Sequence, residues 1–307
     1  MTTSTTSTAP AQRAIWILGA SDPEMERIEA LLMQTKCHFV YATANGRRVH
    51  PGNAYKANHS IIPEGSTVYA VECGWEGETA DVFHIDHHRP GDPGFGRPPA
   101  EFLPASSIGQ VHATLARLAN PEYEDAGEFI LSGQVWSVRM RETDKIVGKF
   151  RLLSLLPLYE DALAAAADHC LGAAYRGECP GINPDVLMRW RAASRAKFQG
   201  RTMAEVLADV EAAGHMLAHA STLRLAPNVF AMDMRSSVPI RELPEAATRL
   251  GIPYVSGPLV GPDGRKKFTV SGFPVTVRAF LDVWAPEEGL VDLYGDPDRG
   301  FAGGYVP

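Results

Sequence analysis

The chain has 307 residues, which is too long for one small domain and fits two. Hydrophobic residues make up 45% of it and charged residues 21%, a balance that excludes a disordered chain, a collagen and a coiled coil. The formal net charge of −7 also excludes a basic protein that coats nucleic acid. Phosphate binding through a metal ion stays open, because the ion supplies positive charge that composition does not count.

The spacing of the cysteines and the composition of the N-terminus indicate in which cellular compartment the protein is expected. The four cysteines lack the C-x-x-C spacing of a zinc ribbon, and in a chain of this length they do not staple a fold. No apolar run approaches the ~20 residues that a membrane helix needs. Residues 1–12 lack the basic start and apolar stretch of a signal peptide. We therefore expect a reduced cytoplasmic protein, not bound to membranes, with a disordered polar tail over 1–12.

The first half of the chain alternates short apolar segments with loops and helices, which predicts an α/β domain with a mainly parallel sheet flanked by helices. Asp22 or Ser21 can cap a helix that follows the first strand, and Pro23 suits its first turn. Parallel sheets place their chemistry at the carboxyl ends of the strands. The expected strands cover 14–20, 38–44, 67–74 and 81–86, and a second helix is expected over 106–118 after a Gly/Pro-rich loop.

The rest of the chain predicts helices followed by a second, smaller α/β domain. The segment 158–177 is dense in Ala and Leu and predicts the strongest helix, whereas 121–150 is ambiguous. A helical linker is expected over 185–222. In the last part, Gly251 ends an amphipathic helix. Strands are expected there over 228–234 and 252–260 and after residue 263, with a further helix over 274–285.

The motif His84-Ile85-Asp86-His87-His88 stands at the end of a predicted strand, before the Gly/Pro-rich loop. Strand alternation puts His84, Asp86 and His88 on one face, while His87 points the other way unless the strand has already ended. Imidazole together with carboxylate is the usual donor set for Mn, Fe or Zn. The alternative interpretation is a surface histidine pair beside a structural aspartate.

The tripeptide Asp86-His87-His88, with the loop and small-residue helix start after it, resembles the DHH phosphoesterase superfamily. Val71-Glu72-Cys73-Gly74 stands where that family has an acidic residue at a strand end, and the segment from Gly19 to Glu24 stands at its first motif. Asp168 is the candidate for a later acidic position. The chain departs from the family in two places: Glu72 replaces an aspartate, and the first motif lacks Asp-x-Asp-Gly.

The resemblance implies a DHH-type metal and catalytic domain over 13–184 and a DHHA1-like substrate-binding domain over 223–307. It implies Mn²⁺ or Mg²⁺ as cofactor, as one or two ions, and two such ions can clamp a phosphoryl group. The implied catalytic residues are His88, His87 and Asp86, with His88 contacting the phosphate or protonating the leaving oxygen. The implied metal ligands are Asp22, Glu72, Asp86, His87 and Asp168. For Glu72 and Asp168, an ordinary cap or solvated carboxylate remains an equal alternative.

Basic side chains and a terminal glycine-rich segment supply the expected substrate contacts. These are Arg47, Arg97, Lys267, Arg299, Gly303 and Gly304, the last three as a backbone anion nest. For each, a solvated surface or a frayed terminus is the competing interpretation. The resulting hypothesis is a hydrolase that cleaves a phosphoester or phosphoanhydride of a small nucleotide or short oligonucleotide.

Two other functions stay open at this point. One is a nucleotide-binding or sequestering protein whose metal site has degraded, which the weak first motif and Glu72 favour. The other is a single-strand exonuclease, which would show a steep dependence on salt. No stable binding of duplex DNA is expected, and a homodimer is an open alternative for the oligomeric state.

Overall fold

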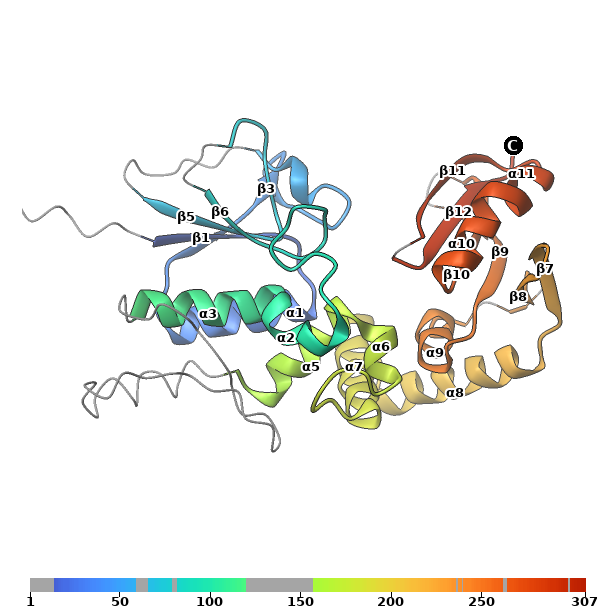
Figure 1. Cartoon of the computed structure of the whole chain (residues 1–307), viewed down its shortest axis with the longest axis horizontal. Coiled ribbons are helices and arrows are strands. Elements are labelled where there is room, and N and C mark those ends of the chain that lie inside the picture. Colours follow the sequence, from blue (N-terminus) through green and yellow to red (C-terminus); the bar gives the residue numbers. More distant parts are fainter. Residues whose placement is uncertain are drawn as a thin grey trace, which may run out of the picture. The chain divides into compact units, whose positions relative to one another are not determined.

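A computed structural model shows the arrangement of most of the chain (Figure 1). The expected tail and the ambiguous stretch 121–150 lie outside the described residues. By its internal contacts the chain forms two compact units: unit 1 is Met1–Cys170 with Glu178–Ile182, and unit 2 is Leu171–Gly177 with Asn183–Pro307. None of the described helices is both long and apolar enough to cross a bilayer. The described residues are 14–58, 66–78, 82–119, 157–235, 237–238, 240–261, 264–297 and 299–307.

Unit 1 contains a four-stranded sheet in which every neighbouring pair of strands runs parallel. Its order is β2-β1-β5-β6, and the strands are Phe39–Tyr41, Ala14–Leu18, Thr67–Val71 and Val82–Ile85 in that order. The prediction of a parallel α/β sheet flanked by helices is confirmed. β1 lies between β2 and β5, so the chain passes from β1 to its neighbour on one side and later to its neighbour on the other side. The place where the strand order reverses in this way, at the carboxyl end of β1, is where such sheets bind ligands.

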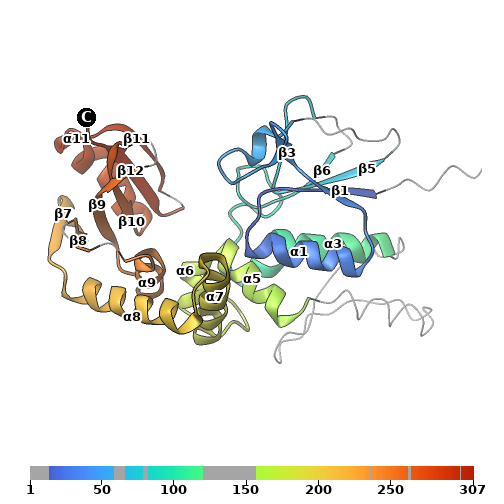
Figure 2. The same cartoon turned by 180° about the vertical axis from the view of Figure 1, so that it is seen from behind.

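Helices cover one face of this sheet, as both views show (Figures 1 and 2). They are α1 (Pro23–Gln34) and α3 (Ser107–Ala119), and α5 (Tyr159–His169) packs against both. A buried cluster that includes Ile17, Ala54 and Trp75 covers the other face. Because both faces are covered, the two central strands, β1 and β5, are buried along most of their length and not alternately exposed.

Short elements complete unit 1. The strand expected over 38–44 is split: after β2 the chain enters a small hairpin of its own. The hairpin pairs β3 with β4, and the other short elements are two 3₁₀ turns and one short helix. Their bounds are Thr43–Ala44 (β3), Arg47–Arg48 (β4), Ala54–Lys56 (η1), Pro99–Glu101 (η2) and Phe102–Ala105 (α2).

Unit 2 contains a six-stranded sheet of order β11-β12-β10-β9-β8-β7. Only β8 and β9 pair in parallel among its described neighbours. The strands are Thr222–Ala226 (β7), Val229–Met234 (β8), Tyr254–Val260 (β9), Lys266–Ser271 (β10), Val291–Asp296 (β11) and Phe301–Tyr305 (β12). The core of this unit gathers Val255, Val270 and Ala302 from the sheet against Phe280 and Trp284.

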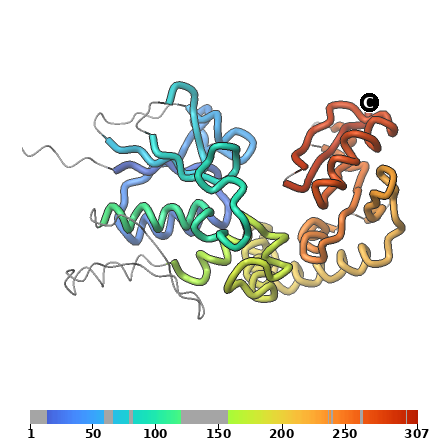
Figure 3. The backbone as a smooth tube through the Cα atoms, viewed as in Figure 1, coloured from blue at the N-terminus to red at the C-terminus, as the bar shows by residue number. Residues whose placement is uncertain are grey.

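The helices of unit 2 can be followed along the tube in Figure 3. Buried carboxylates tie them together: Glu245 pairs with Arg191 at 2.6 Å and accepts a hydrogen bond from the Tyr175 hydroxyl. The segment expected as a linker over 185–222 thus belongs by its contacts to unit 2. The helices are Leu171–Tyr175 (α6), Pro184–Gln199 (α7), Met203–His219 (α8), Leu243–Leu250 (α9) and Pro274–Ala279 (α10), the last continued by Phe280–Trp284 (η3) and Ala285–Glu287 (α11).

Two of the expected helical segments also differ in the structure. The helix predicted over 158–177 is interrupted at Cys170, whose backbone is non-helical at φ −155° and ψ 44°. The helical pattern expected up to residue 222 ends at His219, and β7 follows. Helix propensity does not resolve either boundary, because tertiary contacts decide where a helix ends.

Candidate metal centre

The carboxyl ends of β1 and β5 approach each other closely. Gly19 donates its amide to the Val71 carbonyl at 2.9 Å, and a Cβ at residue 19 would lie 2.2 Å from the Glu72 carbonyl oxygen. A glycine is therefore required where the two backbones meet. Asp22 follows shortly after and caps α1, since its Oδ1 accepts a hydrogen bond from the Met25 amide at 2.7 Å.

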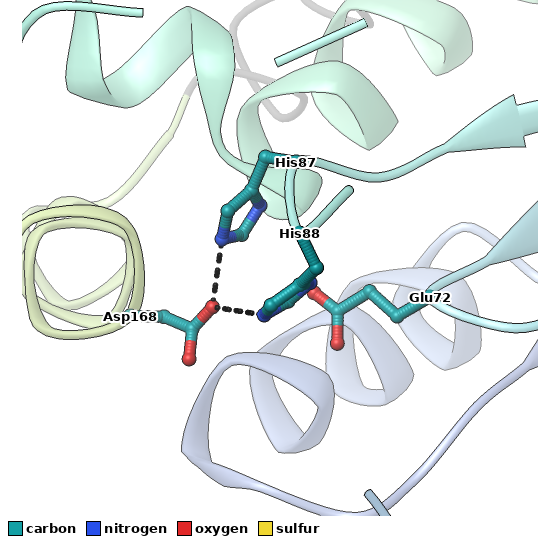
Figure 4. Close-up of side chains that lie close together, drawn as sticks. All are labelled: Glu72, His87, His88 and Asp168. Carbon is teal, nitrogen blue, oxygen red and sulfur yellow. Dashed lines mark ion pairs between the residues drawn. The ribbon is translucent and has the colours of Figure 1, made fainter. Parts of the chain in front are cut away.

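Four side chains gather at this edge of the sheet (Figure 4). Glu72, His87, His88 and Asp168 each offer one donor atom, and these atoms all lie within 4.8 Å of one another. Glu72 follows β5, the two histidines follow β6, and Asp168 lies in the last turn of α5. Two carboxylates and two imidazoles are a donor set for a first-row divalent metal, so this cluster could hold a metal ion.

Asp168 connects the two imidazoles. Its Oδ2 lies 2.8 Å from Nε2 of His87 and 3.3 Å from Nε2 of His88, as the dashed lines in Figure 4 show. Desolvation alone would raise the pKa of Asp168, but hydrogen bonds from His87 and His88 lower it below its usual range. His87 is held from its other side by Ser107, whose Oγ lies 3.3 Å from Nδ1.

Asp86 is fully buried and acts as a hydrogen-bond acceptor. Its Oδ1 accepts from the amides of His87 and His88 and from Nδ1 of His88, and its Oδ2 accepts from the Tyr55 hydroxyl at 2.9 Å. Although burial would raise its pKa, the hydrogen bond from His88 lowers it. Asp86 is not among the four clustered donors, and both of its oxygens accept hydrogen bonds from neighbouring groups.

His88 lies between two carboxylates. Burial alone would lower its pKa, but hydrogen bonds to Asp168 and Asp86 raise the pKa of His88 to about 11. The metal-free site therefore holds His88 as an imidazolium at neutral pH. Its ring stacks on that of His87 with centroids 4.2 Å apart, so the two rings are fixed together.

Glu72 has an unusual backbone conformation and one carboxylate oxygen without a hydrogen-bond partner in the described structure. Its φ of 50° lies in the left-handed region, which is strained for a residue with a side chain. Its Oε1 is buried and has no hydrogen-bond partner among the described residues. Burial, followed by the charges of Asp22 and Asp168, raises the pKa of Glu72 well above its usual value.

Two further carboxylates, those of Asp22 and Glu24 at the start of α1, interact electrostatically with this cluster. Burial and the charge of Asp168 raise the pKa of Asp22 to about 6. Glu24 is 1% exposed; its Oε1 accepts from the Ile108 amide at 2.8 Å, but its Oε2 has no hydrogen-bond partner in the described structure. Burial and the charges of Asp168 and Glu72 raise the pKa of Glu24 as well.

These observations test whether the residues fit a metal ion. Burial and mutual repulsion, together with the charge of Asp168, raise the pKa values of Asp22, Glu24 and Glu72. Glu24 and Glu72 each carry a buried oxygen without a hydrogen-bond partner in the described structure. Such an arrangement is costly when empty, because buried charges require a partner. A divalent cation would neutralise the repulsion and occupy the unsatisfied oxygens, so the residues fit the metal that the sequence predicts.

The predicted substrate contacts of unit 1 lie on its surface. Arg47 is exposed in the β3–β4 hairpin. The Arg97 guanidinium is 58% exposed and lies 3.6 Å from Glu101, while the Arg97 carbonyl lies 3.1 Å from Nε2 of His169. His169 in turn meets the His87 ring edge-on at 5.1 Å. Arg97 is thereby connected to the cluster through His169, whereas no described contact connects Arg47 to it.

The other four predicted contacts belong to unit 2. Gly303 and Gly304 lie in β12, where their residues pair with Thr269 and Phe268 of β10. A Cβ at Gly303 would lie 2.5 Å from the Tyr294 hydroxyl, so packing explains this glycine. The pair is part of a strand and not of the loop nest expected from the sequence. Lys267 and Arg299 lie beside the rings of Tyr294 and Phe301, at 5.8 and 5.9 Å from the ring centroids.

Sequence analysis did not single out two residues that shape the site, Tyr55 and Ser107. Tyr55 reaches Asp86 from η1, outside any motif. Ser107, which contacts His87, lies in the small-residue helix start after Asp86-His87-His88, where sequence analysis assigned it no role of its own. His84, beside the motif, instead pairs with Glu78 at 2.8 Å. No model of a known protein family matches this chain, and no curated protein matches its sequence.

Proposed function

We propose that the protein is a metal-dependent phosphoesterase that hydrolyses a phosphoester or phosphoanhydride of a small nucleotide or short oligonucleotide. The observation that carries the proposal is the convergence of Glu72, His87, His88 and Asp168 within 4.8 Å, at the carboxyl edge of a parallel sheet. The resemblance of the Asp86-His87-His88 segment to DHH phosphoesterases supports the choice of reaction.

Glu72, His87 and Asp168 would hold the ion, with Asp22 and Glu24 beside them. We assign Mn²⁺ or Mg²⁺, since hard carboxylate oxygens dominate the set and imidazole favours Mn²⁺ over Mg²⁺. When bound, such an ion supplies Lewis-acid polarisation of a phosphoryl oxygen and lowers the pKa of a coordinated water. The partly exposed Asp168 side chain, at 28%, leaves this side of the cluster open to a ligand.

His88 has a different role from His87 in this proposal. Asp86 fixes its Nδ1, and its Nε2 lies 3.3 Å from Asp168. A ring fixed in this way suits a group that hydrogen-bonds a phosphoryl oxygen and stabilises the charge that develops on it. Asp86 and Tyr55 orient this group and do not contact the substrate.

The test measures Mn²⁺ binding and hydrolysis separately. Calorimetric titration with Mn²⁺ should show binding by the wild type and by Glu160→Gln, a surface control whose carboxylate is 62% exposed. Glu72→Gln should weaken Mn²⁺ binding by about 100-fold, because it removes a charged ligand. Hydrolysis of bis(p-nitrophenyl) phosphate and of short oligonucleotides should require the ion.

His87→Ala is the decisive variant for catalysis. It should lose hydrolysis while the Glu160→Gln control keeps it. Equal rates in His87→Ala and wild type would overturn the assignment of the site. Mn²⁺ binding without turnover of any phosphoester in the screen would overturn the hydrolase and support a nucleotide-binding protein.

A further inference from the structure

The structure brings together two cysteines that are nine positions apart in the sequence and form no C-x-x-C motif. Cys170 follows the last residue of α5, and Cys179 lies in the turn before α7. Their Sγ atoms are 2.9 Å apart. This exceeds the disulfide bond length of about 2.0 Å by less than one ångström, so little movement separates the two thiols from a covalent bond.

We propose that Cys170 and Cys179 are a redox modification site, at which the two thiols form a reversible disulfide. The proposal stands apart from the proposed phosphoesterase activity, because it rests on the thiol geometry alone. The sequence predicted scattered cysteines, whereas the structure brings the sulfur atoms of Cys170 and Cys179 into contact.

The two remaining cysteines provide an internal contrast. Cys73 follows β5 and is completely buried, so an oxidant does not reach its thiol. Cys37 accepts a hydrogen bond from the Thr35 hydroxyl at 3.4 Å, and no other cysteine sulfur lies in contact with it within the described chain. Only the Cys170–Cys179 pair has a resolving partner in place.

The exposures of the two thiols suggest an order of reaction. Cys170 is partly exposed, whereas Cys179 is 2% exposed. With a small disulfide such as oxidised glutathione, the Cys170 sulfur would attack first and release one glutathione thiol. The Cys179 sulfur would then displace the second glutathione from the mixed disulfide. The protein loses two electrons, glutathione disulfide gains them, and the two thiol protons leave on the two released glutathione molecules.

The chain path gives this cross-link a structural consequence. Cys170 and the segment 178–182 group with unit 1, while the intervening residues 171–177 group with unit 2. A bond between the cysteines would covalently join the two ends of the segment 171–178. It also anchors the backbone two residues after Asp168, at the end of α5.

The test counts thiols in the full chain. After equilibration with excess dithiothreitol, alkylation in denaturant should find the four thiols of the sequence. After equilibration with oxidised glutathione it should find two fewer, and peptide mapping should recover a peptide pair linked through Cys170 and Cys179. Cys37→Ser should lose the same two thiols on oxidation as the wild type does.

Cys179→Ser tests the proposed order and guards against an indirect effect. This variant lacks the resolving thiol, so it should retain one bound glutathione at Cys170 and form no internal cross-link. Four thiols that persist in the wild type with oxidised glutathione would overturn the proposal. A cross-link through Cys37 or Cys73 would overturn it as well.

Discussion

Nδ1 of His88 lies 2.9 Å from Oδ1 of Asp86, and the same oxygen accepts hydrogen bonds from the backbone amides of His87 and His88. The turn after β6 is therefore folded around one carboxylate. This carboxylate sets both the backbone path and the ring orientation of the histidine that faces the cluster.

Asp86→Ala should destabilise the protein by about 3–5 kcal/mol, because it leaves the partly buried ring of His88 and two backbone amides without their acceptor. Tyr55→Phe should cost about 1–2 kcal/mol, since it removes a single hydrogen bond to the other oxygen. Urea unfolding monitored by circular dichroism measures both. Equal losses in the two variants would contradict the central position of Asp86.

The stability of metal-free protein should fall as the pH rises from about 4 to about 6. The pKa of Asp22 is near 3.8 unfolded and about 6 folded, so in this window the folded state binds a proton that the unfolded state does not. The effect amounts to up to about 3 kcal/mol. Glu24 and Glu72 act in the same direction, whereas Asp86 and Asp168, whose pKa values are lowered, contribute stability that is lost only below about pH 4.

Asp22→Asn is the control for this pH dependence, because asparagine preserves the helix cap and removes the titration. Its thermal-unfolding midpoint should vary less between pH 4 and 6 than that of the wild type. Saturating Mn²⁺ should reverse the slope in the wild type, since protons and the ion compete for the same oxygens. A slope that is unchanged by both the variant and the ion would argue against the acidic cluster.

Gly94→Ala should disrupt the loop after the histidines. A Cβ at residue 94 would lie 1.8 Å from the Ala105 carbonyl oxygen and 2.7 Å from Cβ of His87, so the loop must move. We expect destabilisation of about 3 kcal/mol or more and weakened Mn²⁺ binding. The matched control is Gly214→Ala in α8, where the nearest contact is an ordinary 3.5 Å and alanine should stabilise by about 0.5–1 kcal/mol. Differential scanning calorimetry compares the two.

Arg191→Met should separate the stability of unit 2 from ion binding. It leaves the buried Glu245 carboxylate without its guanidinium, which costs about 3–5 kcal/mol when one partner of a buried pair is removed. Denaturant unfolding should show the loss, while calorimetric affinity for Mn²⁺ at a temperature where the variant is folded should stay within about twofold of wild type. A large loss of affinity for Mn²⁺ would show that the stability of unit 2 and ion binding are coupled.

Much of unit 1 could be predicted from local pattern. The apolar runs before Gly19, Glu72 and Asp86 predicted β1, β5 and β6, and Asp22 with Pro23 predicted the start of α1. Parallel topology then places the strand ends at one edge, which is why Glu72 and the histidines were expected together.

The parts that could not be predicted depend on contacts between distant segments. Nothing in the local sequence shows that the Tyr55 hydroxyl donates to one oxygen of Asp86, because the two residues are 31 positions apart. The terminal glycines have the composition of a loop, yet they pair with β10 as part of β12. The Tyr294 hydroxyl leaves no room for a side chain at Gly303. The break at Cys170 lies within an alanine-rich run that favours a helix on propensity alone.

The donors at the sheet edge come from stretches of chain as far apart as Glu72 and Asp168, so they cannot assemble before the strands have paired and α5 has docked. Occupancy by an ion would therefore report completed folding of unit 1. By mass action, each tenfold rise in free ion above its dissociation constant would add about 1.4 kcal/mol to the stability of that unit. The supply of the ion would thus influence how much of the protein is folded.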